Sequence, residues 1–441
     1  MGGDLSTLTI KNILKQQHLS KPCYPITYYT HLDKDKWSSN ENGLIVDLHI
    51  LPDKLMRGVD DGTWFWWCDA QFVRFRDDQL FATTAAFRPR NGLWTAVPNT
   101  LNGRVQVLNL HDPENIDCSI LHRTSSTVFP KVHPHPLGEL VTYCGTGEVV
   151  VMTKQGDPIY SRSRDITNAV HVSCAIANNG VSLACLKRGM GVYFLESYLL
   201  DFAMTCESSL RCHQVCPGFI PTTFASGLVA CKFSPDSKFI AVSSVSGYLF
   251  IVKKFKLEKY RIISTTQTES VLSSSEAFDF NPRTPHECIA FGSRDKYLQL
   301  LNIDTEEVSL VVEVDEAIDC VRYSRDGLFL AVGMRNFDIS IYNSEDLNVM
   351  HKIRMSELCQ EEIPRTAPGY PVVLNLSFTQ DGGHLASSSC EGHVRVWRMP
   401  RLHTLMELSR NRILRSTPIH QVHQLTILPE KLRNFLLYKY F

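Results

Sequence analysis

The sequence predicts an all-β protein built as a closed propeller of about seven blades, followed by a small helical segment at the C-terminal end. Four stretches share one pattern, in which a short alternating run ends on an aromatic residue and two further apolar runs follow, separated by turns. These stretches occupy residues 228–252, 275–303, 317–343 and 373–397. Their anchoring aromatics, spaced by 47, 43 and 55 residues, are Phe233, Phe280, Tyr323 and Phe378. Such spacings bracket the roughly 40 to 45 residues of a four-stranded propeller blade.

Turn chemistry and three weaker copies of the pattern support the repeat. SPDS, SRDG and TQDG supply Asp, Gly and Pro where a tight reversal needs a preset or positive φ. The weaker copies, at 81–110, 128–153 and 170–196, have Phe87, Val132 and Ile176 as the equivalent residues, with spacings of 45, 44 and 57 up to Phe233. Three weak and four clear copies give seven blades, although six or eight remain open. Since a single blade cannot bury both faces of its sheet, the ring must close to be stable.

These repeats resemble the WD40 family in their rhythm more than in their signature. Only the last repeat carries a recognisable end, HVRVW, with Trp397 where the family has its tryptophan. In the family, an N-terminal strand often completes the last blade, and Trp397 ends only a third strand here. The run TWFWWCDAQFVRF at 63–75 is one candidate for that strand, or it opens the first blade. The predicted domains are an N-terminal extension at 1–62, a propeller at 63–399 and a separate C-terminal segment at 400–441.

Composition limits the class of protein. The chain has 441 residues, 44% of them hydrophobic, and a formal net charge of -1, so it can form a large core and has no global field that attracts nucleic acid or a membrane surface. Fourteen cysteines without a leader sequence indicate reduced thiols and a cytoplasmic protein, with the nucleus as a further location. No run approaches the roughly 18 apolar residues of a membrane span. We therefore expect neither nucleic acid nor membrane as a partner.

No motif indicates an enzyme. The chain has no GxxxxGK[ST], GxSxG or HExxH, and we expect no catalytic residue and no cofactor. Cys206, Cys212, His213 and Cys216 could form a zinc site, but they lack a CxxC knuckle, and the interpretation as a reduced loop is favoured. His133 and His135, in HPHP, are expected to be turn residues and not metal ligands. The helical pattern at 5–19 fits either a partner-binding helix or a brace on the propeller.

The C-terminal segment has the pattern of two short amphipathic helices. Leu402, Leu405, Leu408, Arg412 and Ile413 follow one helical stripe at steps of three and four residues. After Pro418 and a connector, a second apolar set follows Pro429, whose missing N–H is tolerated at the start of a helix. Two such helices have more apolar surface than they can bury against each other. Either they pack on the propeller or another protein covers them.

The order of residues in this segment is similar to a SOCS box, and its combination with a WD40 propeller resembles the WD-repeat and SOCS-box-containing proteins. In that family the first half of the box binds elongin C and the second half selects a cullin-5 type scaffold. Ser409 stands where the family has a cysteine, and the second half reads TILP, with one proline and a one-residue insertion. The positions that the resemblance assigns to elongin are Leu405, Leu408, Ser409, Arg410 and Ile413. Those that it assigns to the cullin are Leu425, Ile427, Leu428, Pro429, Leu432, Phe435 and Leu436.

The resemblance implies a non-catalytic subunit of a ubiquitin ligase. The propeller would bind an unknown protein target, and the box would bind elongin C, with elongin B, and a cullin. Ubiquitin transfer then follows from proximity, because the target lysines are held near a charged ubiquitin carrier. The alternative is a WD-repeat scaffold or adaptor in intracellular signalling, with no ubiquitin role. The two hypotheses differ in whether Leu405, Leu408 and Ile413 are presented to a partner or buried on the propeller.

Overall fold

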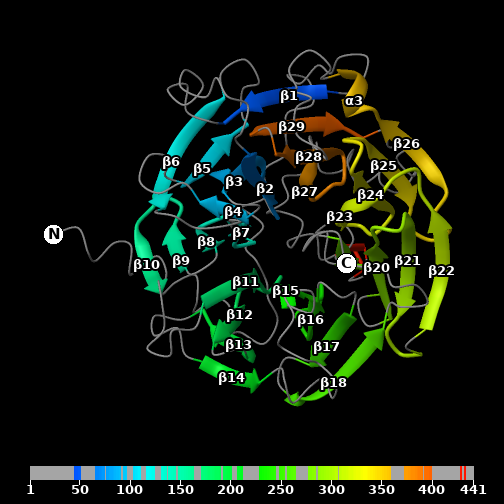
Figure 1. Cartoon of the computed structure of the whole chain (residues 1–441), viewed down its shortest axis with the longest axis horizontal. Coiled ribbons are helices and arrows are strands. Elements are labelled where there is room, and N and C mark those ends of the chain that lie inside the picture. The colour runs from blue at the N-terminus through cyan, green and yellow to red at the C-terminus, as the bar shows by residue number, and fades with distance from the viewer. Residues whose placement is uncertain are drawn as a thin grey trace.

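The computed structural model shows seven β-sheets arranged as blades around a central channel (Figure 1). It describes residues 44–50, 65–74, 76–90, 93–96, 103–110, 116–124, 131–136, 138–145, 148–162, 170–189, 192–200, 206–211, 228–244, 248–253, 256–264, 277–284, 287–305, 307–358, 372–390, 392–399, 428–429 and 432–433. The seven sheets confirm the all-β propeller and exclude the alternatives of six and eight blades.

Each blade is an antiparallel sheet, and its strands are given below in order from the innermost, next to the channel, to the outermost. The first three blades consist of β2 (Phe65–Val73), β3 (Arg76–Arg90), β5 (Gly103–Asn109) and β6 (Asp117–Thr124), with β4 (Leu93–Ala96) paired to β3; then β7 (Lys131–Pro134), β8 (Leu140–Gly145), β9 (Glu148–Thr153) and β10 (Pro158–Arg162); then β11 (Val170–Ile176), β12 (Ser182–Gly189), β13 (Val192–Leu199) and β14 (Cys206–Arg211).

The next three blades repeat this arrangement along the chain. They consist of β15 (Leu228–Phe233), β16 (Phe239–Ser244), β17 (Tyr248–Lys253) and β18 (Lys256–Ser264); then β19 (Phe278–Phe280), β20 (Cys288–Gly292), β21 (Tyr297–Asn302) and β22 (Glu307–Glu313); then β23 (Ile318–Tyr323), β24 (Phe329–Met334), β25 (Ile339–Asn343) and β26 (Val349–Ile353). A single helical turn, α3 (Met355–Leu358), follows β26.

The seventh blade is closed by a strand from the other end of the chain. It contains β27 (Val373–Phe378), β28 (His384–Ser389) and β29 (His393–Arg398), and β1 (Leu44–His49) pairs antiparallel with β29. The expected N-terminal closing strand is therefore present. It is β1 and not the run at 63–75, whose residues form β2, the inner strand of the first blade. The propeller begins at residue 44, inside the segment predicted as an extension.

Burial differs between the inner and the outer strands of a blade. All six residues of the inner strand β27 are buried, including the polar Asn375 and Ser377. Along the outermost strand β22, exposed and half-buried residues alternate, as expected for a strand with one solvated face.

Strand register corrects the equivalence of the two weakest repeats. Phe233, Phe280, Tyr323 and Phe378 each lie opposite an aliphatic residue on the second strand of the blade, and Ile176 does the same. By this criterion the first two blades are anchored by Phe72, opposite Leu80, and by Pro134, opposite Val141. Phe87, the predicted anchor, lies instead on the second strand, and Val132 precedes the true anchor by two residues. The seven residues that share this position, one in each blade, are called the anchors below. They are Phe72, Pro134, Ile176, Phe233, Phe280, Tyr323 and Phe378.

The closing strand is held by charge as well as by backbone pairing. The carboxylate of Asp47 on β1 accepts hydrogen bonds from Arg395 Nε at 2.9 Å and from the ring of His393, whose Nδ1 lies 2.6 Å away. Burial opposes ionisation of Asp47, but the hydrogen bond with His393 and the charge of Arg395 outweigh it, so the pKa of Asp47 is below its ordinary value. The side chain of Arg395 is only 1% exposed, which makes its pairing with Asp47 important for stability.

Trp397, the last recognisable residue of the repeat signature, packs in the core of the same blade. Its side chain is fully buried and donates a hydrogen bond from Nε1 to Ser387 Oγ at 2.9 Å. It packs in the cluster of apolar residues between the sixth and seventh blades, beside Phe378 and Leu385. The position of Trp397 in the sequence thus marks the junction where the ring closes.

We predict that Asp47→Ala lowers the free energy of unfolding by about 2 kcal/mol at neutral pH, because it leaves a buried guanidinium without its carboxylate. Urea unfolding followed by tryptophan fluorescence measures this. Glu313→Ala, which removes an exposed carboxylate on β22, is the control and should change stability by less than about 0.5 kcal/mol. Because the pKa of Asp47 is lowered by folding, its contribution should be lost as the pH falls below the ordinary value of 3.8. An equal effect of both substitutions would contradict the role of Asp47.

Candidate functional site

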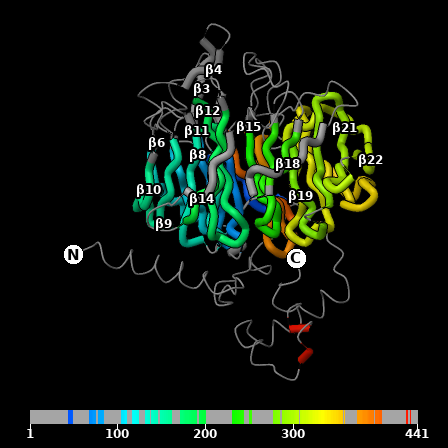
Figure 2. Tube along the Cα trace, turned by 90° about the horizontal axis from the view of Figure 1, so that it is seen from below, coloured from blue at the N-terminus to red at the C-terminus, as the bar shows by residue number. Residues whose placement is uncertain are grey.

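Most residues that the sequence assigns to elongin and cullin binding lie outside the described residues. This applies to Leu405, Leu408, Ser409, Arg410 and Ile413, and to Leu425, Ile427, Phe435 and Leu436. The three that are described, Leu428, Pro429 and Leu432, lie in the segment coloured red in Figure 2, away from the blades. Their assignment to a cullin stays a prediction.

The described residues of this segment make two backbone hydrogen bonds of helical type. The carbonyl oxygen of Pro429 accepts hydrogen bonds from the backbone N–H of Leu432 at 2.9 Å and of Arg433 at 3.0 Å. The second amphipathic helix stays a prediction, because the residues that would continue it lie outside the described residues. The side chain of Leu432 is 45% exposed, an unusual value for a leucine on the apolar side of such a pattern. It is therefore available for contact with a partner.

The central channel contains a cavity of about 140 Å³, and all seven blades contribute residues to its lining. The residue before the anchor points into the channel in every blade, and these seven residues are called the channel ring. They are Gln71, His133, Ala175, Lys232, Asp279, Arg322 and Ser377. In a strand, side chains alternate between the two faces, so the anchor packs between blades while its predecessor faces the channel.

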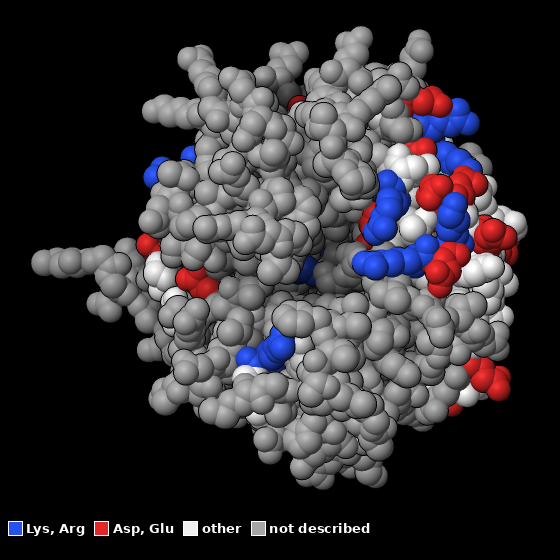
Figure 3. Space-filling model, viewed as in Figure 1, with Lys and Arg blue, Asp and Glu red and all other residues white. Residues whose placement is uncertain are grey.

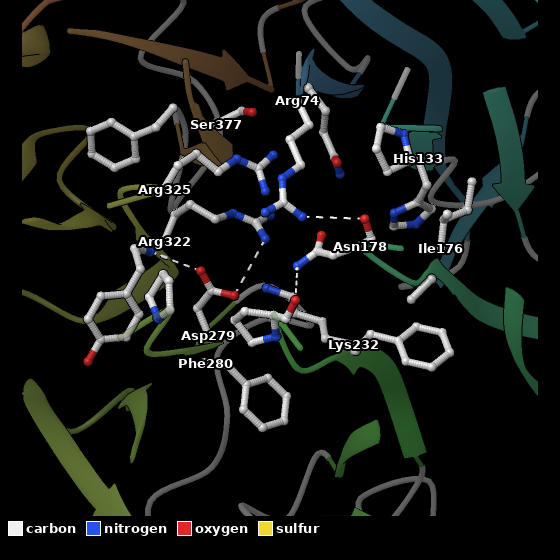
Figure 4. Close-up of a pocket in the computed structure, with 18 of the residues that line it drawn as sticks. Arg74, His133, Ile176, Asn178, Lys232, Asp279, Phe280, Arg322, Arg325 and Ser377 are labelled. Atoms are coloured by element: carbon white, nitrogen blue, oxygen red, sulfur yellow. Dashed lines mark hydrogen bonds and ion pairs between the residues drawn. The ribbon is translucent and has the colours of Figure 1, made fainter. Parts of the chain in front are cut away.

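A second layer lies two residues after the anchors, where each inner strand turns into the next strand. These mouth residues are Arg74, Pro136, Asn178, Pro235, Pro282 and Arg325. Together with the channel ring they give the cavity four positively charged side chains, Arg74, Lys232, Arg322 and Arg325, and one carboxylate, Asp279, among the lining residues that the structure describes. Figure 4 shows the three guanidinium groups converging at the centre of the cavity.

The deeper cations of the cavity also join one blade to the next. Arg322 donates from Nε to the carbonyl of Leu376 at 2.9 Å and from Nη2 to Asn375 Oδ1 at 2.8 Å, both in the seventh blade. Lys232 makes a similar contact between the fourth and fifth blades, where its Nζ donates to the carbonyl of Phe278 at 2.7 Å. The neighbouring blades thus hold both side chains in place.

Asp279 orients Arg322 from the neighbouring blade. One carboxylate oxygen of Asp279 accepts the backbone N–H of Tyr323 at 2.9 Å, and the other lies 3.8 Å from Arg322 Nη1. The side chains of Arg322 and Asp279 are 20% and 17% exposed. The carboxylate is therefore occupied by its own blade junction and balances only part of the positive charge.

Polar links of the same kind occur at the other junctions. Asp69 accepts the N–H of Val132 at 2.8 Å, Ser173 accepts that of Cys231 at 3.3 Å, and Ser377 accepts that of Phe72 at 3.0 Å. Buried backbone donors next to a channel have few other partners, so each link removes the cost of an unsatisfied N–H. Inner-strand residues, among them Ser377 of the channel ring, therefore stabilise the closed propeller.

The remaining junction is made by His135, one residue after the anchor of the second blade. His135 is fully buried, and its Nε2 lies 3.2 Å from the carbonyl of Gly180 in the third blade. Burial lowers the pKa of His135 to about 4, so the ring is neutral at physiological pH. This placement agrees with the expected role as a turn residue. His133 lies within strand β7 and on the channel ring, so the prediction that it is a turn residue was wrong.

The described residues offer little to a metal ion. They contain no group of three or more His, Cys, Asp or Glu side chains that could hold one. In the expected loop, Cys206 begins β14, while Cys212, His213 and Cys216 lie outside the described residues. The nine cysteines whose side chains the structure describes are free thiols, most of them buried, and burial raises the pKa of Cys231 to about 12. Such thiols are unreactive, in keeping with a packing role.

The two ends of the propeller chain lie on the same face as the mouth residues. Met399 donates its N–H to the carbonyl of Gly383, in the turn between β27 and β28, and Leu44 lies opposite Trp397. The chain therefore enters β1 and leaves β29 at the face where the inner strands turn outward, which is the lower face in Figure 2. Figure 3 shows the opposite face, where charged side chains of both signs gather over β20 to β26 around a central hollow.

Sequence reasoning missed the basic cavity, although the repeat contained a signal for it. Once an anchor is known, the residue before it and the second residue after it are predicted to face the channel. In the four clear repeats this rule identifies Lys232, Asp279, Arg322 and Arg325. Arg74 required the corrected anchor Phe72, which only the strand register supplies.

Comparison with known families identifies WD40 repeats in the second half of the chain. Residues 279–361 match the model of the anaphase-promoting complex subunit 4 WD40 domain, and residues 363–398 match the WD domain, G-beta repeat. A search of curated proteins gave no match. Within the described residues, no helix is both long and apolar enough to span a membrane. The chain thus contains a seven-bladed WD40-type propeller, a fold suited to binding other proteins.

We predict that the stability of the propeller falls as the pH decreases from 6.5 to 4, by up to about 3 kcal/mol from His135 alone. In that range the unfolded chain binds a proton at His135 and the folded chain does not, because the folded pKa is about 4. Urea unfolding at a series of pH values measures the slope. His135→Gln should be less stable at pH 7 but should show a smaller slope, whereas His351→Gln, at a half-buried site on β26, should retain most of it. An unchanged slope in His135→Gln would contradict the assignment.

Proposed function

We propose that this protein is the substrate-recognition subunit of an elongin B/C and cullin-5 type ubiquitin ligase. The propeller binds the target protein, and residues 400–441 bind elongin C and the cullin. The chain itself is not an enzyme; it holds the target near the ubiquitin carrier and raises the effective concentration of the target's lysines. The proposal places the protein in the cytoplasm, with the nucleus as a further location.

The observation that carries this proposal is the way in which the ring closes. β1 supplies the fourth strand of the last blade, so the strand pairing of the seventh blade is complete at Met399. Residues 400–441 are not needed as a strand of the propeller. An apolar segment of this length outside a completed fold needs another surface to cover it.

The described part of the segment supports the same conclusion. The hydrogen bonds of helical type at Pro429 agree with a second helix in the order that a SOCS box has, and Leu432 is partly exposed. The segment leaves the propeller on the face of the mouth residues. A target bound at that face would lie on the same side of the propeller as the box.

A second candidate function is a WD-repeat adaptor with no role in ubiquitin transfer. The matches to WD40 models favour protein binding in general and are neutral between these two functions. In the adaptor, residues 400–441 would pack permanently on the propeller. The two functions are distinguished by whether that segment binds elongin C.

We predict that elongins B and C co-purify with the full chain and that Leu405→Ala combined with Leu408→Ala abolishes this. Loss of two buried anchors at such an interface costs several kcal/mol, which corresponds to more than a hundredfold in affinity. The matched control is Val349→Ala with Met350→Ala, which removes two exposed apolar side chains from β26 of the propeller. Failure of the wild type to retain elongin, or full retention by the double variant, would overturn the proposal and favour the adaptor.

We further predict that Leu432→Asp weakens cullin binding at least tenfold and leaves elongin binding unchanged. The side chain is 45% exposed, so the substitution should not unfold the segment, whereas a charge in an apolar interface is strongly unfavourable. Affinity for the cullin N-terminal region is measured on the purified complex with elongins B and C. Equal cullin affinities of the wild type and Leu432→Asp would contradict the assignment of this half of the box.

A further inference from the structure

The cavity of the channel gathers more positive than negative side chains. Its four cations come from three blades: Arg74 from the first, Lys232 from the fourth, and Arg322 and Arg325 from the sixth. Arg74 and the two arginines of the sixth blade point toward the same volume across the seventh blade (Figure 4). All four side chains are half-buried, so their mutual repulsion is less screened than at an open surface.

Such a convergence of cations is stable when an anion occupies the space between them. The carboxylate of Asp279 is the only acidic side chain among the described lining residues, and it is held by Tyr323 and Arg322 at the wall of the cavity. The described lining therefore carries a formal charge of about three positive units with Asp279 ionised. A doubly charged anion would reduce this excess more than a carboxylate would.

The geometry favours an anion with several acceptor oxygens. Guanidinium groups donate in planar pairs that match phosphate oxygens, and a phosphate monoester offers three acceptors and a charge of about -1.5 to -2 at neutral pH. Arg322 is preorganised by its hydrogen bonds to Leu376 and Asn375, which reduces the entropy cost of binding. The mouth arginines, Arg74 and Arg325, lie one layer further out, at the entrance.

The volume of the cavity limits the size of the ligand. A cavity of about 140 Å³ with proline residues in its wall accepts one phosphoryl group and a short part of the ligand to which that group is attached. A larger polyphosphate would bring further negative charge against Asp279. The cavity thus fits a single phosphate monoester.

We propose that the central channel is a binding site for a phosphate monoester group, with Arg74, Arg322 and Arg325 as its ligands and Lys232 as a further source of positive charge. The group is carried either by a phosphorylated peptide or by a small phosphorylated molecule. The site lies within the propeller and is independent of what residues 400–441 bind.

Isothermal titration calorimetry on the full chain tests this with four probes: inorganic phosphate, the peptide Ala-Ala-phosphoserine-Ala-Ala, and the same peptide with serine or with glutamate. The wild type should bind the phosphopeptide and inorganic phosphate, with an affinity that falls as salt is raised, and should not bind the serine peptide. Tighter binding of the phosphopeptide identifies a peptide as the source, and equal or tighter binding of inorganic phosphate identifies a small molecule. Binding of the glutamate peptide as tightly as the phosphopeptide would overturn the preference for phosphate.

Variants distinguish binding in the cavity from nonspecific attraction of the probes to positive charge on the protein surface. Arg74→Gln with Arg325→Gln should weaken phosphopeptide binding at least tenfold, and Arg74→Lys with Arg325→Lys should retain part of it, because charge remains while the planar donor pairs are lost. Lys296→Gln with Arg335→Gln removes the same charge from ion pairs with Glu316 and Asp319 and should bind as the wild type does. Arg325→Gln alone, at the half-buried mouth, gives the same direction if the double variant fails to fold. Absence of binding to every probe, or equal losses in the channel and control variants, would overturn the proposal.

Discussion

The pairing of β1 with β29 is the constraint on which the rest of the structure depends. It joins residue 44 to residue 397 and converts seven sheets that cannot bury their faces separately into one closed ring. Asp47 stabilises this contact by compensating the buried charge of Arg395. Closure also fixes the channel, because the inner strands can face one another only when every blade has two neighbours.

The same closure separates the molecule into a propeller and a segment that the propeller does not need as a strand. Both chain connections lie on the face of the channel mouth, so the chain leaves the propeller at Met399 on the same face as the mouth residues. A ligase receptor requires a target site and a machinery site in one molecule. On the proposed function, the propeller provides the first and residues 400–441 the second.

The sequence predicted the features that depend on local patterns. The four clear repeats and their turns predicted the fold class, and the three weaker copies brought the predicted number of blades to seven, because alternation and turn chemistry are short-range signals. It misplaced the first two anchors, since Phe87 and Val132 give spacings of 45 and 44 residues up to Ile176, which fit the expected blade length better than the 62 and 42 of Phe72 and Pro134. It could not choose the closing strand, because pairing across nearly 350 residues has no local signal. The basic cavity was missed for the same reason: Arg74 and Arg322 approach one another only after closure.

The most direct test of the central claim, that the ring is complete without residues 400–441, is hydrogen exchange followed by mass spectrometry on the full chain, alone and with elongins B and C. Backbone amides of β1 and β29 should be protected in both samples, because their pairing belongs to the closed propeller. Amides of residues 400–441 should exchange rapidly in the chain alone and become protected in the complex. Strong protection of that segment in the chain alone, unchanged by elongins, would show that the propeller covers it and would contradict the account.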